Sequence, residues 1–330
     1  MTILTRFQGS AAIITLNRPQ RYNASNLETI TQIAEFLSEC RENTKIKKII
    51  ISSDHPKAFC AGGDIKAAYD AMNTKNLDDA KAFFELEYKL IYSLATYPKP
   101  IISLVNGLCF GGGMGLSMHN AIRVLTQNAM LGMPETIIGF FPDVGASFRF
   151  AQFPKAWANY YALTGNTIPI AHALRWNMAD YFVDASCLPA LLDALTHDAP
   201  PEKIFENFSK QAPDESVFGE NWVEDVFEKG LQEIFETLKV HENSETQKTL
   251  IDLNARSPLS LRVTHKLLEV TSSLDLKKSL ELDNIIALNF MKDSDFQEGI
   301  RAQIIDKDKN PKWKYGPLDI NDDKVEAFFR

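Results

Sequence analysis

The chain of 330 residues is long for one domain, and its composition, 45% hydrophobic and 24% charged, is that of an ordinary globular protein. Its formal net charge of −8 argues against a general attraction to nucleic acid or to an anionic membrane. The four cysteines have no metal-ligand or redox spacing and the six histidines no paired spacing, so we expect no metal site. Reduced thiols, and the absence of an apolar run of signal-peptide or membrane-spanning type, predict a cytoplasmic protein.

The N-terminal segment predicts a sheet. Residues 2–7 and 11–17 read as two strands joined by a glycine-containing turn, which is a hairpin signal. Ser25 followed by Glu28 predicts a capping box, and the helix behind it has one apolar face. The strand at 48–52 then completes a β-α-β unit, which implies a parallel sheet.

Two glycine-rich turns each follow a strand and precede a helix. The first contains Gly62 and Gly63, and the second spans residues 106–115. Glycine permits positive φ, and the start of a helix presents unpaired N–H groups in a positive potential. Two such turns on one sheet can supply the two N–H donors of an oxyanion hole. The alternative is tight helix–strand packing alone. Cys60 and Cys109, which lie in these segments, are expected to be buried thiols rather than nucleophiles.

Three carboxylates lie in apolar surroundings. Glu87 falls within the apolar stripe of a helix predicted for 78–97, although it would reach water if it lay at the edge of that stripe. Glu135 and Asp143 each follow a proline and lie eight residues apart. If they converge on one pocket, two such carboxylates can divide the roles of general acid and general base. The alternatives are that Asp143 caps a helix starting near Val144 and that Glu135 caps a helix or occupies its first turn.

The rest of the chain is predicted to be mainly helical. Helices and a short strand at 181–183 fill residues 154–184, further helices follow to residue 250, and two long helices span 255–290. Residues 306–313 read as a basic exposed turn. Arg18 and Arg21 are interpreted as solvated surface residues, with a phosphate contact as the alternative.

Four segments resemble the crotonase (enoyl-CoA hydratase/isomerase) superfamily in order and spacing. They are Lys57–Lys66, Asn106–Gly115, Pro134-Glu135, and the terminal stretch of Glu298–Ala302 followed by residues 306–313. The resemblance implies an α/β fold with a ββα spiral core, here residues 1–200, and a helical C-terminal region, residues 201–330. It implies an acyl-CoA substrate whose carbonyl lies between the N–H groups of Gly63 and Gly112.

One departure narrows the resemblance. Gly115 stands where typical hydratases carry a catalytic Glu, which puts water addition in doubt. Residues 133–145, Phe83–Tyr88 and Ile304–Trp313 are instead similar to the 3-hydroxyisobutyryl-CoA hydrolase branch. In that branch Glu135 and Asp143 correspond to the catalytic carboxylates. The resemblance implies that these two residues and Gly112 also bind the substrate, and that Glu87 contacts the substrate.

The expected reaction is hydrolysis of a short 3-hydroxyacyl-CoA thioester, with 3-hydroxyisobutyryl-CoA in valine breakdown as the substrate. Hydration or isomerisation of another acyl-CoA, and acyl-CoA binding without catalysis, are the alternatives. The resemblance implies no metal or redox cofactor, because coenzyme A arrives as part of the substrate. It also implies a possible homo-oligomer formed through the C-terminal helices, and no nucleic-acid or membrane partner is expected.

Overall fold

A computed structural model describes residues 1–74, 77–211, 221–316 and 319–330. The chain forms two compact units, and each is assembled from segments distant in sequence. The first comprises Met1–Gly63, Lys89–Leu131 and Ile168–Glu215, and the second Asp64–Tyr88, Gly132–Thr167 and Ser216–Arg330. The predicted boundary at residues 200/201 separates a core from a C-terminal region. The two packing units do not test that boundary, because each combines segments from several parts of the chain.

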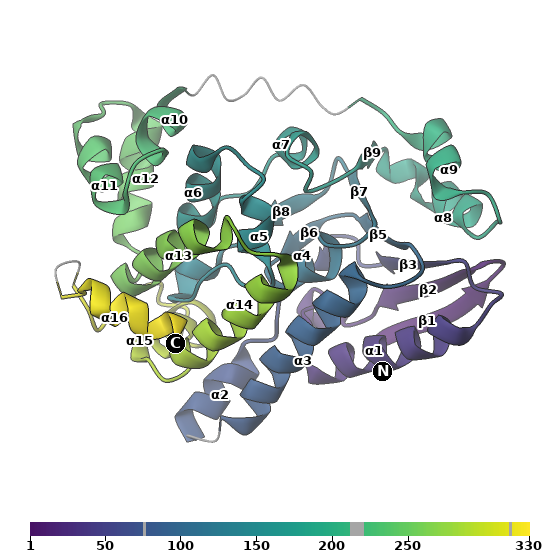
Figure 1. Ribbon diagram of the computed structural model, residues 1–330, viewed down its shortest axis with the longest axis horizontal. Helices are drawn as coiled ribbons and strands as arrows, with labels where there is room; N and C mark the ends of the chain where they lie inside the picture. Colours follow the sequence, from purple (N-terminus) through teal and green to yellow (C-terminus); the bar gives the residue numbers. More distant parts are fainter. Residues whose placement is uncertain (75–76, 212–220, 317–318) are drawn as a thin grey trace. The chain divides into compact units, whose positions relative to one another are not determined.

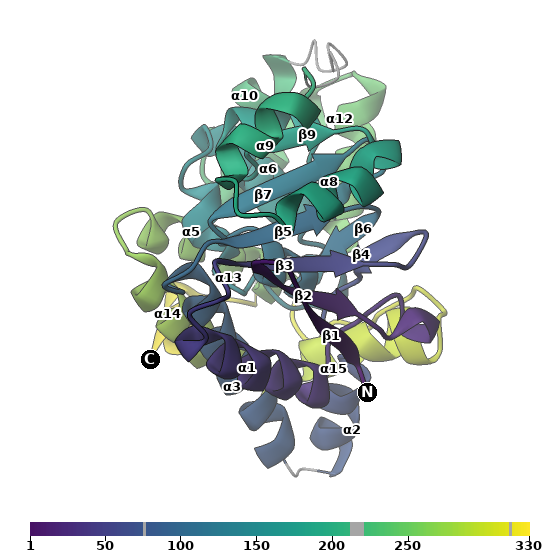
Figure 2. The same ribbon diagram turned by 90° about the vertical axis from the view of Figure 1, so that its right-hand side faces the viewer.

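The first unit is built on a six-stranded sheet. Its strands follow the order β1 (Ile3–Gln8), β2 (Ala11–Leu16), β3 (Lys48–Ser53), β5 (Ile101–Val105), β7 (Ile122–Thr126) and β9 (Tyr181–Val183) (Figure 2). The pair β1–β2 is antiparallel and every other pair is parallel. The predicted hairpin and β-α-β unit are therefore confirmed. A second sheet has the order β4 (Ala58–Cys60), β6 (Leu108–Phe110), β8 (Met130–Gly132).

The helices of the first unit are short apart from one. They are α1 (Leu27–Glu42), α4 (Gly112–Ser117), α7 (Ile170–Arg175), α8 (Leu188–Leu195) and α9 (Pro201–Phe208), with 3₁₀ turns η1 (Pro19–Arg21) and η3 (Ala185–Cys187). Apolar side chains of α8 and α9 pack with the central strands into one buried cluster. Arg18 donates to the backbone oxygen of Ala24, so it holds its own loop.

The predicted capping box at the start of α1 is wrong by one residue. Asn26 is the N-cap, and its side chain accepts a hydrogen bond from the Thr29 N–H at 2.9 Å. Ser25 belongs to the preceding turn, where its N–H donates to the Gly62 oxygen at 2.8 Å. Ser and Asn can both cap a helix, so the local sequence does not distinguish Ser25 from Asn26. The hydrogen bond between Ser25 and the Gly62 segment decides that Asn26 is the cap.

The second unit is mainly helical (Figure 1). Its elements are α2 (Lys66–Thr74), η2 (Glu135–Ile138), α5 (Ala146–Phe150), α6 (Lys155–Thr164), α10 (Asn221–Phe227), α11 (Leu231–Val240), α12 (Ser244–Asn254), α13 (Pro258–Thr271), α14 (Leu276–Phe290), α15 (Ser294–Ile300), the π-helical turn η4 (Arg301–Ile305), α16 (Asp322–Glu326) and η5 (Ala327–Phe329). Helix α3 (Asp78–Ala95) contributes to both units. The Phe140 ring stacks on Phe296 at 4.3 Å and on Phe84 at 5.8 Å.

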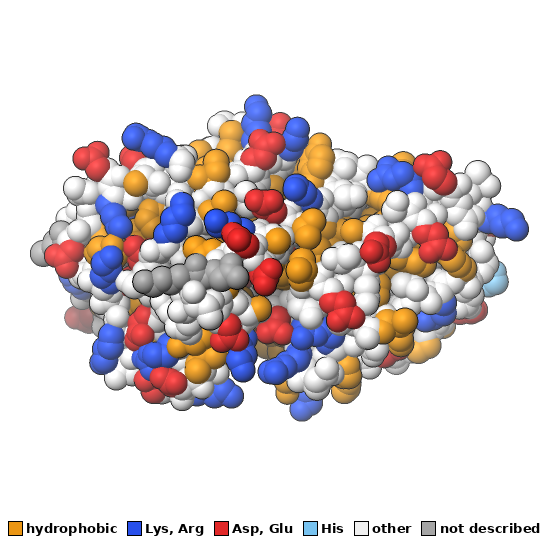
Figure 3. All heavy atoms as spheres, turned by 90° about the horizontal axis from the view of Figure 1, so that it is seen from below, with side chains coloured by type: hydrophobic (Ala, Val, Ile, Leu, Met, Phe, Trp, Pro, Cys, Tyr) orange, Lys and Arg blue, Asp and Glu red, His pale blue; other side chains and the backbone are white. Residues whose placement is uncertain are grey.

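Among the described helices, none has both the length and the apolar character needed to cross a membrane. The face drawn in Figure 3 carries acidic and basic side chains side by side, with small apolar areas between them.

Candidate active site

The second unit gathers the three predicted carboxylates into one buried cluster. Glu87, Glu135 and Asp143 are 3%, 9% and 5% exposed. Two further polar side chains, Tyr88 and Asp283, join them, and both are buried. The charges of Glu87 and Asp143 act on Glu135, and those of Asp143 and Asp283 act on Tyr88. We call these five residues the acidic cluster.

Helix α3 supplies Glu87 and Tyr88. Both lie on the buried face that begins with Ala80 and Phe84 and turns toward the core at helical spacing. The alternative that Glu87 lies at the edge of the apolar stripe and reaches water is therefore excluded. Burial removes a carboxylate from water at a substantial free-energy cost, so a polar cluster is needed around it.

Glu135 is the first residue of η2, directly after Pro134. Its backbone oxygen accepts from the Phe140 N–H at 3.0 Å, and Gly139, at φ +69°, closes the turn. A side chain at Gly139 would meet the backbone oxygen of Asp295 at 2.7 Å, which explains glycine there. Within the described chain, Oε2 of Glu135 is buried and has no hydrogen-bond partner. The first-turn placement expected as an alternative is thus correct, but it leaves one carboxylate oxygen free for chemistry.

Asp143 does not cap a helix. Helix α5 begins at Ala146, and its N-cap, Gly145, makes no side-chain cap bond. The Asp143 carboxylate instead accepts a hydrogen bond from the Tyr88 hydroxyl, at 2.7 Å from Oδ2. Asp283 on α14 is bound to the same loop, because its Oδ2 accepts from the Gly145 N–H at 2.7 Å.

Burial raises the pKa of carboxyls in the acidic cluster. Burial raises the pKa of Glu135 well above its ordinary value, and the neighbouring charge of Asp143 raises it further. Burial also raises the pKa of Asp143, to about 7, although the hydrogen bond from Tyr88 opposes the rise. Since these groups interact, they titrate as a unit, which is the arrangement that divides acid and base roles between carboxyls.

The two glycine turns adjoin each other in the first unit. Gly62 has φ +116°, and a side chain there would lie 3.9 Å from the Gly112 nitrogen. Gly112 is the first residue of α4, so its N–H has no partner within the helix. In the described chain, neither the Gly63 nor the Gly112 N–H donates to a backbone oxygen. The amides belong to the first unit and the acidic cluster to the second.

The cysteines beside these turns are buried, as expected. Burial raises the pKa of the Cys109 thiol, which disfavours the thiolate that a nucleophilic cysteine needs.

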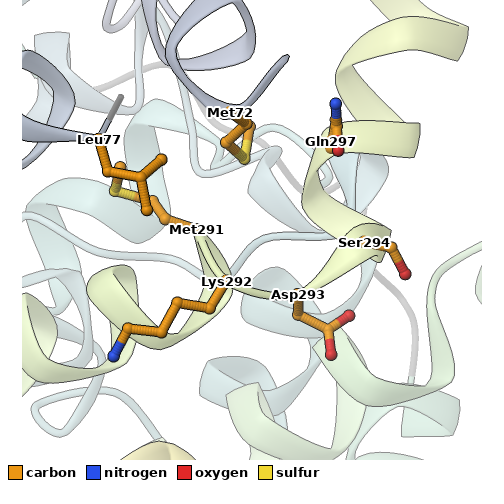
Figure 4. Close-up of a pocket in the computed structure, with 7 residues that line it drawn as sticks. All are labelled: Met72, Leu77, Met291, Lys292, Asp293, Ser294 and Gln297. Carbon is orange, nitrogen blue, oxygen red and sulfur yellow. The ribbon is translucent and has the colours of Figure 1, made fainter. Parts of the chain in front are cut away.

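A separate hollow of about 280 Å³ lies in the second unit, where α2 meets the start of α15. Figure 4 shows its lining residues, which include none of the predicted site residues: Met72, Leu77, Met291, Lys292, Asp293, Ser294 and Gln297. Two of its polar groups already have partners. Gln297 donates to Asn73 at 2.7 Å, and Asp293 accepts from Tyr315 at 3.1 Å.

Sequence reasoning missed two members of the acidic cluster. Tyr88 enters the sequence analysis only as the last residue of the Phe83–Tyr88 segment. Asp283 lies three residues after Leu280 and four before Ala287, within the apolar stripe of a predicted helix. The spacing that singled out Glu87 therefore applied to Asp283 as well.

The chain matches the model of the enoyl-CoA hydratase/isomerase family over residues 11–329, and it belongs to that family. Its fold agrees: it aligns over 100% of its length with 96% of a carnitinyl-CoA dehydratase from Mycobacterium thermoresistibile, at a TM-score of 0.94 and 27% identity. The predicted superfamily and α/β fold class are confirmed.

Two curated relatives carry different names. The chain is 36% identical to the mitochondrial 3-hydroxyisobutyryl-CoA hydrolase of Xenopus tropicalis, over 97% of this chain and 86% of that protein. It is 34% identical to small ribosomal subunit protein mS47 of Schizosaccharomyces pombe, over 94% of this chain and 76% of that protein.

The prediction of a cytoplasmic location is wrong, because the hydrolases that this chain resembles are named as mitochondrial. The cytoplasmic prediction rests on reduced thiols and on the absence of an apolar run of signal-peptide or membrane-spanning type. Mitochondrial targeting segments are amphipathic and arginine-rich rather than continuously apolar, so that test does not address them.

Proposed function

We propose that this protein hydrolyses the thioester of a short 3-hydroxyacyl-CoA, with 3-hydroxyisobutyryl-CoA as substrate, in valine breakdown. The observation that carries the proposal is the burial of both Glu135 and Asp143, close enough for the charge of one to act on the other, in a chain related to hydrolases of that name. Assignment to mitochondria follows as part of the proposal, since those relatives are named mitochondrial.

The amides of Gly63 and Gly112 donate to the thioester oxygen and stabilise the oxyanion as it forms. Losing one such donor typically costs about 10²–10³ in rate. Glu135, once ionised, acts at the carbonyl carbon, either as a nucleophile that forms an acyl-enzyme anhydride or as a base on water. Its unpaired Oε2 supports either role.

The leaving thiolate takes up a proton to become free coenzyme A, and water supplies the oxygen of the acid product. Asp143 either binds the 3-hydroxyl of the substrate or assists departure of the thiolate. With a pKa of about 7, the Asp143 carboxyl can donate a proton near neutral pH. Glu87 lies beside Glu135, where it contacts the substrate and raises the pKa of Glu135.

Release of free thiol from 3-hydroxyisobutyryl-CoA tests the proposal. Glu135→Gln keeps the shape of the side chain but removes its basicity, so kcat should fall by roughly 10²–10⁴. Glu85→Gln, at an exposed position of α3, is the matched control and should retain kcat within about twofold. Equal rates for Glu135→Gln and wild type would remove Glu135 from the mechanism.

The same assay separates the alternatives. Hydration or isomerisation leaves the thioester intact, so product analysis would show a modified acyl-CoA and no thiol. A protein that only binds acyl-CoA would bind the substrate without turnover.

A further inference from the structure

One carboxyl of the acidic cluster, Asp283, has no role in the proposed reaction. Asp283 is 0% exposed on α14, and its Oδ2 accepts the Gly145 N–H at 2.7 Å from a residue 138 positions away in sequence. Within the described chain, its other oxygen has no hydrogen-bond partner. An apolar side chain would fill a core position at lower cost, so a carboxyl here needs a specific reason.

The segment that Asp283 contacts is strained. Val144 has φ +54° and Gly145 φ +74°, and the Ala146 N–H donates to the Asp143 backbone oxygen at 2.9 Å. Two successive positive φ angles under such a bond make a type I′ turn, which favours Asn-Gly and disfavours a β-branched residue. A valine in this conformation is strained and persists only where its surroundings hold it.

Asp143 is the first residue of that turn, so the direction of its side chain depends on the turn. In a type I′ turn the N–H of the third residue points away from the turn and needs an acceptor. Asp283 supplies the acceptor, and the Tyr88 hydroxyl then meets the Asp143 carboxylate at 2.7 Å. The turn is held by α14 and the carboxylate by α3.

We propose that Asp283 is a positioning residue, which holds the Asp143–Ala146 turn through the Gly145 N–H and so fixes the Asp143 carboxyl for the reaction. The expected effect on kcat rests on the proposed function. The expected effect on the geometry of the turn does not, because the turn exists without substrate.

The kinetic test compares Asp283→Asn with Asp283→Ala. Asn offers the same acceptor oxygen, so kcat should stay within about threefold of wild type. Ala removes the acceptor and lets the turn relax, and kcat should fall roughly 10–100-fold with little change in KM, because a misplaced group costs about that much. Ile286→Ala, a buried position on the same helix, controls for lost stability and should keep kcat near wild type.

Crystal structures of both variants supply the readout that needs no substrate. In Asp283→Ala we expect Val144 to leave its positive φ and the Tyr88–Asp143 contact to lengthen, and in Asp283→Asn both should be retained. An unchanged turn in Asp283→Ala, or equal loss of kcat in the Ala and Asn variants, would overturn the inference. If wild type releases no thiol while the turn relaxes as expected, the proposed reaction fails and the positioning role stands.

Discussion

At the scale of single residues, the acidic cluster opposes the stability of the fold. Glu135, Asp143 and Asp283 are buried, and burial raises the pKa of each. A carboxyl whose pKa is raised on folding binds its proton more tightly in the folded chain. In the window between the ordinary value of 3.8 and about 7, Asp143 is therefore ionised in the unfolded chain and protonated in the folded one, so stability falls as pH rises.

Replacing Asp143 by Asn should remove that penalty. Asn cannot ionise, and its oxygen can still accept from Tyr88. We expect the melting temperature of Asp143→Asn to match that of wild type at pH 4 and to exceed that of wild type by roughly 5–10 °C at pH 8. The variant should also lose thiol release. Thermal unfolding across this pH range measures the difference, and Asp225→Asn at an exposed position reports what removal of one surface charge does. A margin that stays constant with pH would contradict a raised pKa.

At the scale of elements, helix α4 sets the direction of the Gly112 N–H. Gly113, in its first turn, packs directly on β4, where an added side chain would overlap the backbone oxygen of Cys60. Glycine is needed there because the helix approaches the strand closely, and this explains part of the glycine run in terms of packing. The packing alternative and the oxyanion prediction are therefore compatible.

Gly113→Ala should push α4 away from β4 and tilt the Gly112 amide. We expect kcat/KM to fall at least about tenfold and the free energy of unfolding to fall by about 1–3 kcal/mol. Gly230→Ala is the control, since a side chain there meets only the Glu233 carboxylate at 3.6 Å. Urea unfolding with thiol-release kinetics gives both quantities. Full activity in a destabilised Gly113→Ala protein would show that the α4 packing does not place a reactive amide.

At the scale of the whole molecule, relatives of similar identity carry the names of an enzyme and of a ribosomal protein. The net charge of −8 argues against a general attraction to RNA phosphates, and the face in Figure 3 carries both signs of charge. The buried acidic cluster favours the enzyme. Assembly into a homo-oligomer through the C-terminal helices stays a prediction, which light scattering of the purified protein would test.

We expect the protein to sediment apart from small ribosomal subunits in a lysate of its own cells at physiological salt. Because contacts to RNA phosphates weaken steeply with salt, a gradient repeated at higher ionic strength separates loose adsorption from assembly. Salt-resistant co-sedimentation with the subunit would contradict the expectation.

Local patterns in the sequence determined the elements and the family. Glycines at strand-to-helix turns and a carboxylate within an apolar stripe are visible because sterics and helical periodicity act over a few residues. These patterns singled out Glu87 and the two glycine-rich turns, whereas the choice of Gly63 and Gly112 as donors, and of Glu135 and Asp143 as catalytic carboxylates, came from the resemblance to the family. The roles given to them remain predictions.

The tertiary structure alone decided how the carboxyls are paired. No local rule connects Asp283 with Gly145, or the Tyr88 hydroxyl with Asp143, because each pair joins elements far apart in sequence. The N-cap of α1 was also decided by tertiary structure: Ser25 is bonded to the distant Gly62 turn, and Asn26 caps the helix instead. Burial and hydrogen-bond partners depend on which segments pack together, and this long-range packing sets the pKa values that the proposed chemistry needs.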